Sequence, residues 1–119
     1  MANNIKQKAL SPSLKEKRRY LVYELISDNN YNYKDLKETI ISSFKELFGL
    51  DGLSKAGLDF IEYQGNKGII RVSNKGLDML KASFCFVRKI NKDEIVLRSL
   101  GVYGMLNKAR SKFILGGEI

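Results

Sequence analysis

Two clusters of Lys and Arg near the ends of this 119-residue chain carry side chains whose chemistry suits phosphate binding. Residues 1–19 hold six bases and one acid, and residues 98–119 hold four bases and one acid. Residues 20–97 hold eleven of each sign, so the two ends supply the whole formal net charge of +8. Because guanidinium and ammonium groups neutralise phosphates, this distribution predicts a polyanionic partner. The candidate contact residues are Lys15, Lys17, Arg18, Arg19, Arg98, Lys108, Arg110 and Lys112.

The residue types that support nucleophilic and metal chemistry are scarce. The chain has no histidine, which excludes imidazole bases, imidazole zinc ligands and Ser-His or Cys-His pairs. Its one cysteine, Cys85, cannot close an internal disulfide, and we interpret it as a small buried hydrophobe on a helix. The adjacent acids Asp93 and Glu94 would point apart, so we predict no metal site. Tyr20 is a candidate for stacking on a base or ribose, with packing in a core or interface as the alternative.

Composition also bounds the setting of the protein. No apolar run approaches the roughly 20 residues that a bilayer span needs, and residues 1–8 lack the apolar core of a signal peptide. These features favour nucleic acid over an anionic membrane as the polyanion. A single cysteine fits a reducing compartment, so we expect the protein in the cytoplasm.

The spacing of apolar residues predicts one α+β domain over residues 10–115, between a basic flexible tail (1–9) and a flexible C-terminus (116–119). The order strand, helix, strand, strand, helix, strand, helix predicts a ferredoxin-like (RRM-like) two-layer sandwich. Its four-stranded antiparallel sheet would carry helices on one face. The expected strands are 18–26, 57–64, 69–73 and 94–102, and the expected helices are 33–48, a segment starting after Asn74, and 105–115.

Local signals mark the ends of these elements. Asn32 is the expected cap of the first helix and Gly49 its end, and residues 50–56 are predicted to form a loop. Asn74 is the expected cap of the second helix, and 91–93 form a predicted turn. Within the last helix, Leu106, Ala109 and Phe113 are expected to face inward. Because the first and fourth strands would lie in one neighbourhood, Arg18, Arg19 and Arg98 are expected on a common surface near the last helix.

Three stretches of the sequence resemble the archaeal ribonuclease P protein component 2 family. Residues 11–21, followed by Glu24, resemble its opening, in which a proline and a basic cluster precede an Arg-Tyr pair and the first strand. Residues 76–83 are similar to its second helix, and residues 97–109 resemble its strand-to-helix ending. The chain departs from the family at Tyr103 and Met105, where Ser and Thr are common around the glycine.

The resemblance implies a non-catalytic protein subunit of the ribonucleoprotein that removes the 5′ leader from precursor tRNA. The RNA is the catalyst there and would hold any magnesium, so the protein itself needs no cofactor. The implied partners are ribonuclease P RNA, precursor tRNA, ribonuclease P protein component 3 and a second copy of the chain.

Three other functions remain open at this level. A general RNA-binding module of the RRM type would place aromatic residues on its third strand, and residues 69–73 contain none. An acylphosphatase-like hydrolase would need a glycine-rich anion loop after the first strand, and residues 27–31 contain no glycine. A dimerising ferredoxin-like interaction or ligand-sensing module would explain the sheet but not the charge at the two ends.

Overall fold

The computed structural model describes residues 17–115, which form a four-stranded sheet, three helices and a small hairpin. The predicted tails, residues 1–9 and 116–119, lie outside the described residues. The elements in chain order are β2 (Arg18–Ile26), α2 (Tyr33–Ala56), β3 (Asp59–Gln64), β4 (Lys67–Ser73), α3 (Leu77–Phe86), β5 (Lys89–Ile90), β6 (Asp93–Glu94), β7 (Val96–Tyr103) and α4 (Leu106–Leu115).

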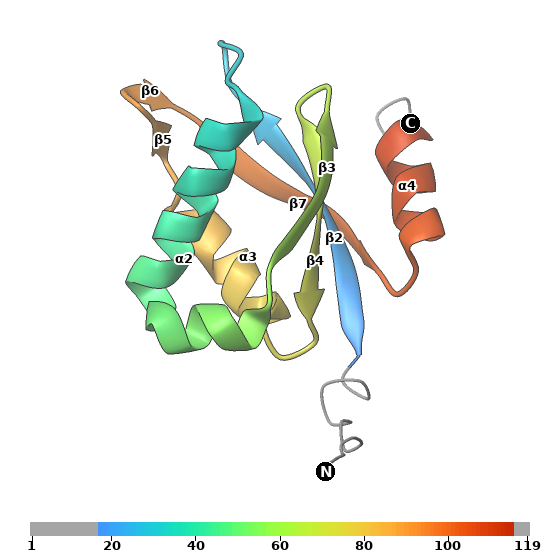
Figure 1. The fold of residues 1–119 in the computed structure, drawn as a ribbon. Coiled ribbons are helices and arrows are strands. Elements are labelled where there is room, and N and C mark those ends of the chain that lie inside the picture. Colours follow the sequence, from blue (N-terminus) through green and yellow to red (C-terminus); the bar gives the residue numbers. More distant parts are fainter. Residues whose placement is uncertain (1–16, 116–119) are drawn as a thin grey trace.

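The sheet has the strand order β3-β4-β2-β7, and each neighbouring pair is antiparallel. The first strand of the domain, β2, therefore lies in the centre, with β7 beside it at one edge. Helices α2 and α3 connect strands that are not neighbours, and both lie on the same face of the sheet (Figure 1). The predicted ferredoxin-like α+β fold is confirmed.

The main core lies between the sheet and the two crossover helices. Alternate residues of β2 enter it, because successive side chains of a strand point to opposite faces. Leu21 and Tyr23 are 0% exposed and Leu25 is 2% exposed. Leu36, Ile40 and Phe44 form the buried stripe that the spacing of the first helix predicts. Each large side chain buried in this way contributes about 1.5–3 kcal/mol to folding.

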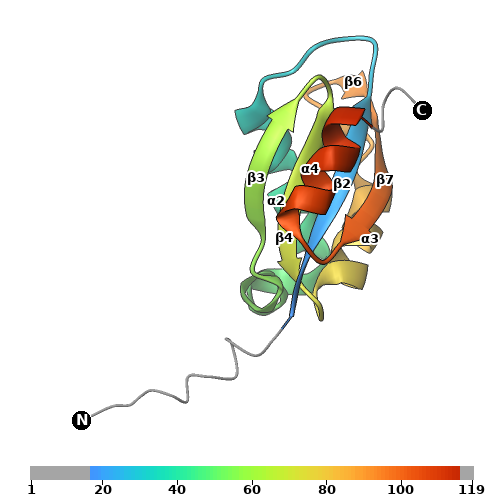
Figure 2. The same ribbon diagram turned by 90° about the vertical axis from the view of Figure 1, so that its right-hand side faces the viewer.

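Helix α4 lies on the opposite face of the sheet, across β2 and β4 (Figure 2). Its Ala109 is fully buried and forms a second core with Val22 of β2 and Ile69 of β4. Leu106 packs against this cluster, so the inward positions predicted for Leu106 and Ala109 are confirmed. The prediction of helices on one face holds for α2 and α3 but was wrong for α4, because the order of the elements does not determine the face on which a terminal helix packs. In this protein α4 covers the centre of the sheet face that an RRM-type protein would leave free.

Helix α2 is longer than the sequence predicts. Asn32 caps it as expected, since its Oδ1 accepts a hydrogen bond from the Asp35 backbone N–H at 2.8 Å. Gly49 interrupts the helix with φ 74°, but helical structure resumes and runs to Ala56, so the predicted loop over residues 50–56 was wrong. The added segment packs closely, because a Cβ at Gly52 would lie 2.7 Å from the Phe48 Cβ. Because glycine has a low helix propensity, Gly52 made this segment look like a loop in the sequence.

Both ends of β4 are tight corners, and the cap predicted at the second one was wrong. The two-residue turn between β3 and β4 has positive φ at both Gly65 (59°) and Asn66 (68°), the twist that suits a tight hairpin. Asn74 does not cap α3, because the helix begins two residues later than predicted, after Gly76. Ser73 serves this corner instead, and its Oγ accepts a hydrogen bond from the Gly76 N–H at 3.0 Å.

The segment between α3 and β7 also differs in detail. Leu80, Phe84 and Val87 are buried, but the prediction of a buried Cys85 was wrong, because Cys85 lies one position round the helix from Phe84 and is exposed. The predicted fourth strand begins at Val96 rather than residue 94. Residues 89–94 form the separate β5–β6 hairpin around the predicted turn.

Candidate nucleic-acid interface

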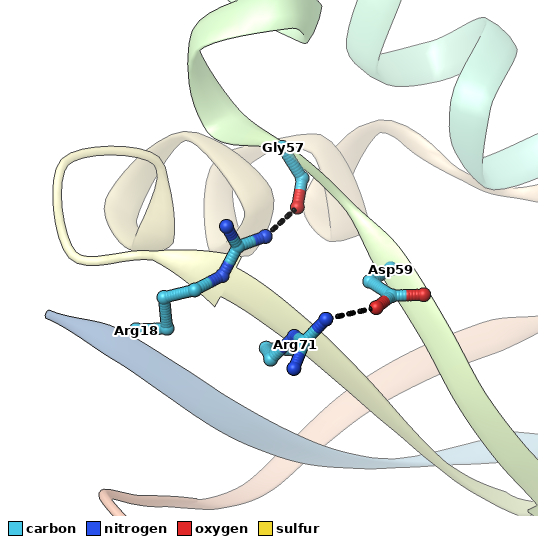
Figure 3. A network of polar contacts seen from close by, with 4 residues as sticks. All are labelled: Arg18, Gly57, Asp59 and Arg71. Carbon is cyan, nitrogen blue, oxygen red and sulfur yellow. Dashed lines mark hydrogen bonds and ion pairs between the residues drawn. The ribbon is translucent and has the colours of Figure 1, made fainter. Parts of the chain in front are cut away.

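The first basic cluster lies where β2 begins. Lys17 and Arg18 are exposed and Arg19 is partly buried, while Lys15 lies outside the described residues. The Arg18 Nη2 donates a hydrogen bond of 2.8 Å to the carbonyl oxygen of Gly57, the left-handed residue that ends α2 (Figure 3). Arginine near the end of a helix satisfies carbonyl groups that have no partner within the helix. Arg18 is therefore held at the end of α2 while most of its donors remain free.

A row of four polar side chains crosses the sheet beside this cluster. Register pairs Tyr103 of β7 with Tyr20 of β2, Tyr20 with Arg71 of β4, and Arg71 with Asp59 of β3. Directly paired residues share a face, and this is the face that α4 occupies, because Tyr20 and Tyr103 pack against the second core. The row therefore lies beside α4, two residue pairs inward from Arg18 at the start of β2.

Arg71 is a polar residue of this face that the sequence analysis did not select. Its guanidinium forms an ion pair with Asp59, and the two side chains are 36% and 46% exposed (Figure 3). The pKa of Arg71 is raised above its ordinary value, first by the Tyr20 phenol and then by the Asp59 carboxylate, against a lowering by burial. The alternation of side chains along β4 is the signal that could have identified Arg71, because it puts Arg71 on the same face of the sheet as Ile69. Its charge escaped notice because an equal number of acids cancels the bases of residues 20–97.

Tyr20 is partly buried against the second core and faces Arg71. The Tyr20 ring therefore packs in a core, which is the alternative to base stacking given in the sequence analysis. Stacking on a base stays a prediction, because part of the side chain remains accessible.

The second basic cluster lies on α4. Lys108 and Lys112 are exposed one helical turn apart, and neither has an ion-pair partner among residues 17–115. Arg110 lies on another side of the helix and its Nε is 2.7 Å from Glu62 Oε1 of β3. Two of the three bases on α4 are consequently free to meet a polyanion, and the third is paired with a carboxylate.

Arg98 does not join the cluster at the start of β2. The antiparallel register places it opposite Glu24, and its Nη2 is 2.7 Å from Glu24 Oε1. Glu24 lies six residues along β2 from Arg18, which is about 20 Å at the rise of a strand. The two ends of the chain thus contribute to one face, but they do so as separate groups rather than as one compact patch.

Other kinds of site find little support in residues 17–115. No group of three or more His, Cys, Asp or Glu residues there could hold a metal ion. No helix in the described part combines the length and apolar composition needed to cross a bilayer. A groove of about 930 Å³ lies between the end of α3 and the start of β7, away from the basic residues of β2 and α4, and its lining includes exposed Ile26 and Val96.

The comparisons with known proteins agree with the fold. The family model described as the Rpp14/Pop5 family matches residues 19–114. A protein of Methanococcus vannielii named Ribonuclease P protein component 2 is 34% identical over 90% of this chain and 82% of its own length. Proteins of the same name from Thermococcus gammatolerans and Methanosarcina mazei are 32% and 34% identical, over 92% and 90% of this chain and 92% of each relative.

A solved structure shows the same architecture at low identity. A chain in the cryo-EM structure of yeast Ribonuclease MRP superposes with a TM-score of 0.64 at 12% identity, covering 87% of this chain and 92% of that chain. At this identity the likeness concerns the fold alone. The match of the family model over residues 19–114 and the relatives above 30% identity reach further, and the resemblance found in the sequence is confirmed. This chain belongs to the Rpp14/Pop5 family.

Proposed function

We propose that this protein is a non-catalytic subunit of ribonuclease P that binds the RNA component and supports removal of the 5′ leader from precursor tRNA. Membership of the Rpp14/Pop5 family carries the proposal, together with the names of its archaeal relatives. In this role the RNA performs the chemistry and holds the magnesium, and the protein needs no cofactor. The proposed partners are the ribonuclease P RNA, precursor tRNA, ribonuclease P protein component 3 and a second copy of this chain, in the cytoplasm.

The surface supports this role on physical grounds. Lys17, Lys108 and Lys112 are exposed bases without ion-pair partners among the described residues, so they can release counterions from phosphates. Such contacts fix the position of an RNA without reading its sequence. This suits a protein that supports a folded catalytic RNA.

The position of α4 disfavours the general RNA-binding alternative. RRM-type proteins stack bases on the open face of the sheet. Here Val22 and Ile69, at the centre of that face, are 0% exposed beneath Ala109. Single-strand stacking over the sheet centre would require α4 to leave, with the loss of a buried core cluster.

The test is cleavage of precursor tRNA by a reconstituted archaeal ribonuclease P RNA at modest magnesium, with the other protein subunits present and this chain added or withheld. The proposal expects stimulation that depends on both this chain and component 3. Tight RNA binding without stimulation would favour a general RNA-binding module. The absence of both, with self-association retained, would favour a dimerising interaction domain.

A further inference from the structure

Two arginines from neighbouring strands converge on the start of β3. Arg18 of β2 reaches the carbonyl of Gly57, and Arg71 of β4 reaches the carboxylate of Asp59, two residues later (Figure 3). In Figure 3 both side chains stand on the same side of the sheet, with α2 and α3 behind it. The register agrees, because Arg18 pairs with Ser73 and Tyr20 pairs with Arg71, which makes the two arginines diagonal neighbours.

Both guanidinium groups keep donors available. An arginine has five N–H donors in a planar fork. Arg18 directs one nitrogen to Gly57, and Arg71 directs one to Asp59. The Nε of Arg71 is buried and has no hydrogen-bond partner among the described residues. Protein atoms cover this Nε, so the donors of Arg71 that an RNA phosphate can reach are those of the Nη groups that Asp59 leaves free.

The local charge also leaves room for an anion. Arg18 and Arg71 against Asp59 give a net charge of +1. Lys17 and Arg19 are next to Arg18 in the chain and have no ion-pair partner among residues 17–115, although the alternation of β2 directs Arg19 to the other face of the sheet. By contrast, the ion pairs at Arg98 and Arg110 each balance one base with one acid. The convergence point is thus where the face combines fixed arginines with an excess of positive charge.

We propose that Arg18 and Arg71 together bind one phosphodiester of the RNA, with the Gly57 carbonyl and Asp59 holding the two forks in place. This inference rests on the proposed RNA-binding function and adds Arg71 as a contact residue and Asp59 as a positioning residue. A guanidinium that is already anchored loses little side-chain freedom when it binds, whereas the free Lys108 and Lys112 must be immobilised. Two parallel N–H donors also match the oxygens of a phosphate better than one ammonium does.

The same contacts could serve folding alone. Arg18 would then only satisfy the end of α2, and Arg71 would only form a cross-strand pair with Asp59. A half-exposed pair of this kind contributes little to stability, so affinity and stability can be separated by mutation.

The experiment measures binding of an in vitro transcribed archaeal ribonuclease P RNA to the full chain over a series of salt concentrations. The variants are Arg71→Gln, Arg71→Lys and, as the control, Arg88→Gln, with urea unfolding measured for each. Arg88 is exposed beside β5, which lies at the end of the sheet opposite the start of β2 (Figure 1). The control therefore removes the same charge far from the convergence point.

We expect Arg71→Gln to bind about tenfold more weakly, because the substitution removes a charge-assisted hydrogen bond to the phosphate. The slope of log affinity against log salt should become less steep by about 0.7–0.9, the value of one lost phosphate contact. Arg71→Lys, which keeps the charge and the pair with Asp59, should recover less than half of the lost affinity. Arg88→Gln should stay within about twofold of the wild type.

Each contrary outcome has its own meaning. If the wild type shows no salt-dependent RNA binding, the proposed function itself fails. If the wild type binds but Arg71→Gln behaves like Arg88→Gln, the phosphate site is overturned and Arg71 has a structural role. Wild-type affinity in Arg71→Lys would overturn the requirement for a guanidinium fork, and this variant decides the matter even if Arg71→Gln proves unstable.

Discussion

Replacing Tyr23 by Phe should stabilise the protein by about 1 kcal/mol at pH 7. Tyr23 is 0% exposed, and its hydroxyl has no hydrogen-bond partner among the described residues. A buried hydroxyl without a partner costs about 1–3 kcal/mol, whereas the ring contacts with Phe84 and Tyr63 survive in the variant. The variant also loses the van der Waals contacts of the hydroxyl oxygen, so the net gain in the free energy of unfolding should lie near the lower end of this range of about 1–3 kcal/mol.

The same substitution should matter more at alkaline pH. Burial, followed by the neighbouring Tyr33 and Tyr63, raises the pKa of Tyr23 far above its ordinary value. The unfolded chain loses this proton above about pH 10 while the folded chain keeps it, so the unfolded state binds fewer protons and stability falls as pH rises. One such group costs about 1.4 kcal/mol per pH unit. The advantage of Tyr23→Phe should therefore grow to roughly 2.5 kcal/mol at pH 11.

Urea unfolding at pH 7 and pH 11 measures both effects. Tyr63→Phe is the matched control, because the Tyr63 hydroxyl lies in an exposed contact with Asn66 Oδ1 at 3.5 Å, and its change at pH 7 should stay within about 0.5 kcal/mol. A Tyr23→Phe variant that is destabilised at pH 7 would refute the reasoning, since the hydroxyl would then have a partner. An advantage that does not grow with pH would show that Tyr23 ionises in the folded state.

Three further predictions concern packing and charge. Gly68→Ala should destabilise the protein by about 1–3 kcal/mol in urea unfolding, because a Cβ there would lie 2.5 Å from the Tyr23 ring; an unchanged midpoint would contradict this close approach. Replacing Lys108 and Lys112 together by Ala should make the salt dependence of RNA binding less steep by up to roughly 1.4–1.8 with stability unchanged, and an unaltered slope would remove α4 from the interface. Replacing Lys17, Arg18 and Arg19 together by Ala should weaken RNA binding and lower the free energy of unfolding by about 0.5–1.5 kcal/mol, because the hydrogen bond from Arg18 to Gly57 is lost. Arg18→Lys should retain more of the affinity. Full affinity in the triple variant would exclude these three residues from the interface.

The strands and the paths between them were predictable because the signals are local. Alternation fixed the buried face of β2, and the apolar stripe of α2 followed from its spacing. The segment after Gly49 was missed because its helix rests on packing: Gly52 contacts Phe48 and Met79, and a glycine in that position argues against a helix unless the contact is known. The exposure of Cys85 likewise depends on which side of α3 meets the sheet.

The candidate site was predictable as a charge distribution and not as a geometry. Residue counts show that the excess bases lie at the two ends of the chain, but they do not show which residues face each other across neighbouring strands. Only the pairing of β2 with β7 shows that Arg98 faces Glu24 rather than the start of β2. Arg71 was hidden for the converse reason, because the acid that cancels it in a count is the one that holds its guanidinium in place.

The position of α4 connects the fold to the proposed mode of RNA binding. With Ala109 seated on Val22 and Ile69, the centre of the sheet offers no surface for a base, and the polar residues of that face are left beside the helix and at the end of β2. Side chains beside α4 and at the end of β2 can reach the phosphate backbone of an RNA more readily than the edges of its bases. A protein built in this way should bind a structured RNA through its phosphates, with affinity that depends steeply on salt and weakly on sequence. Exchanging base pairs within a bound RNA helix should consequently change the affinity much less than a single Arg71→Gln substitution does.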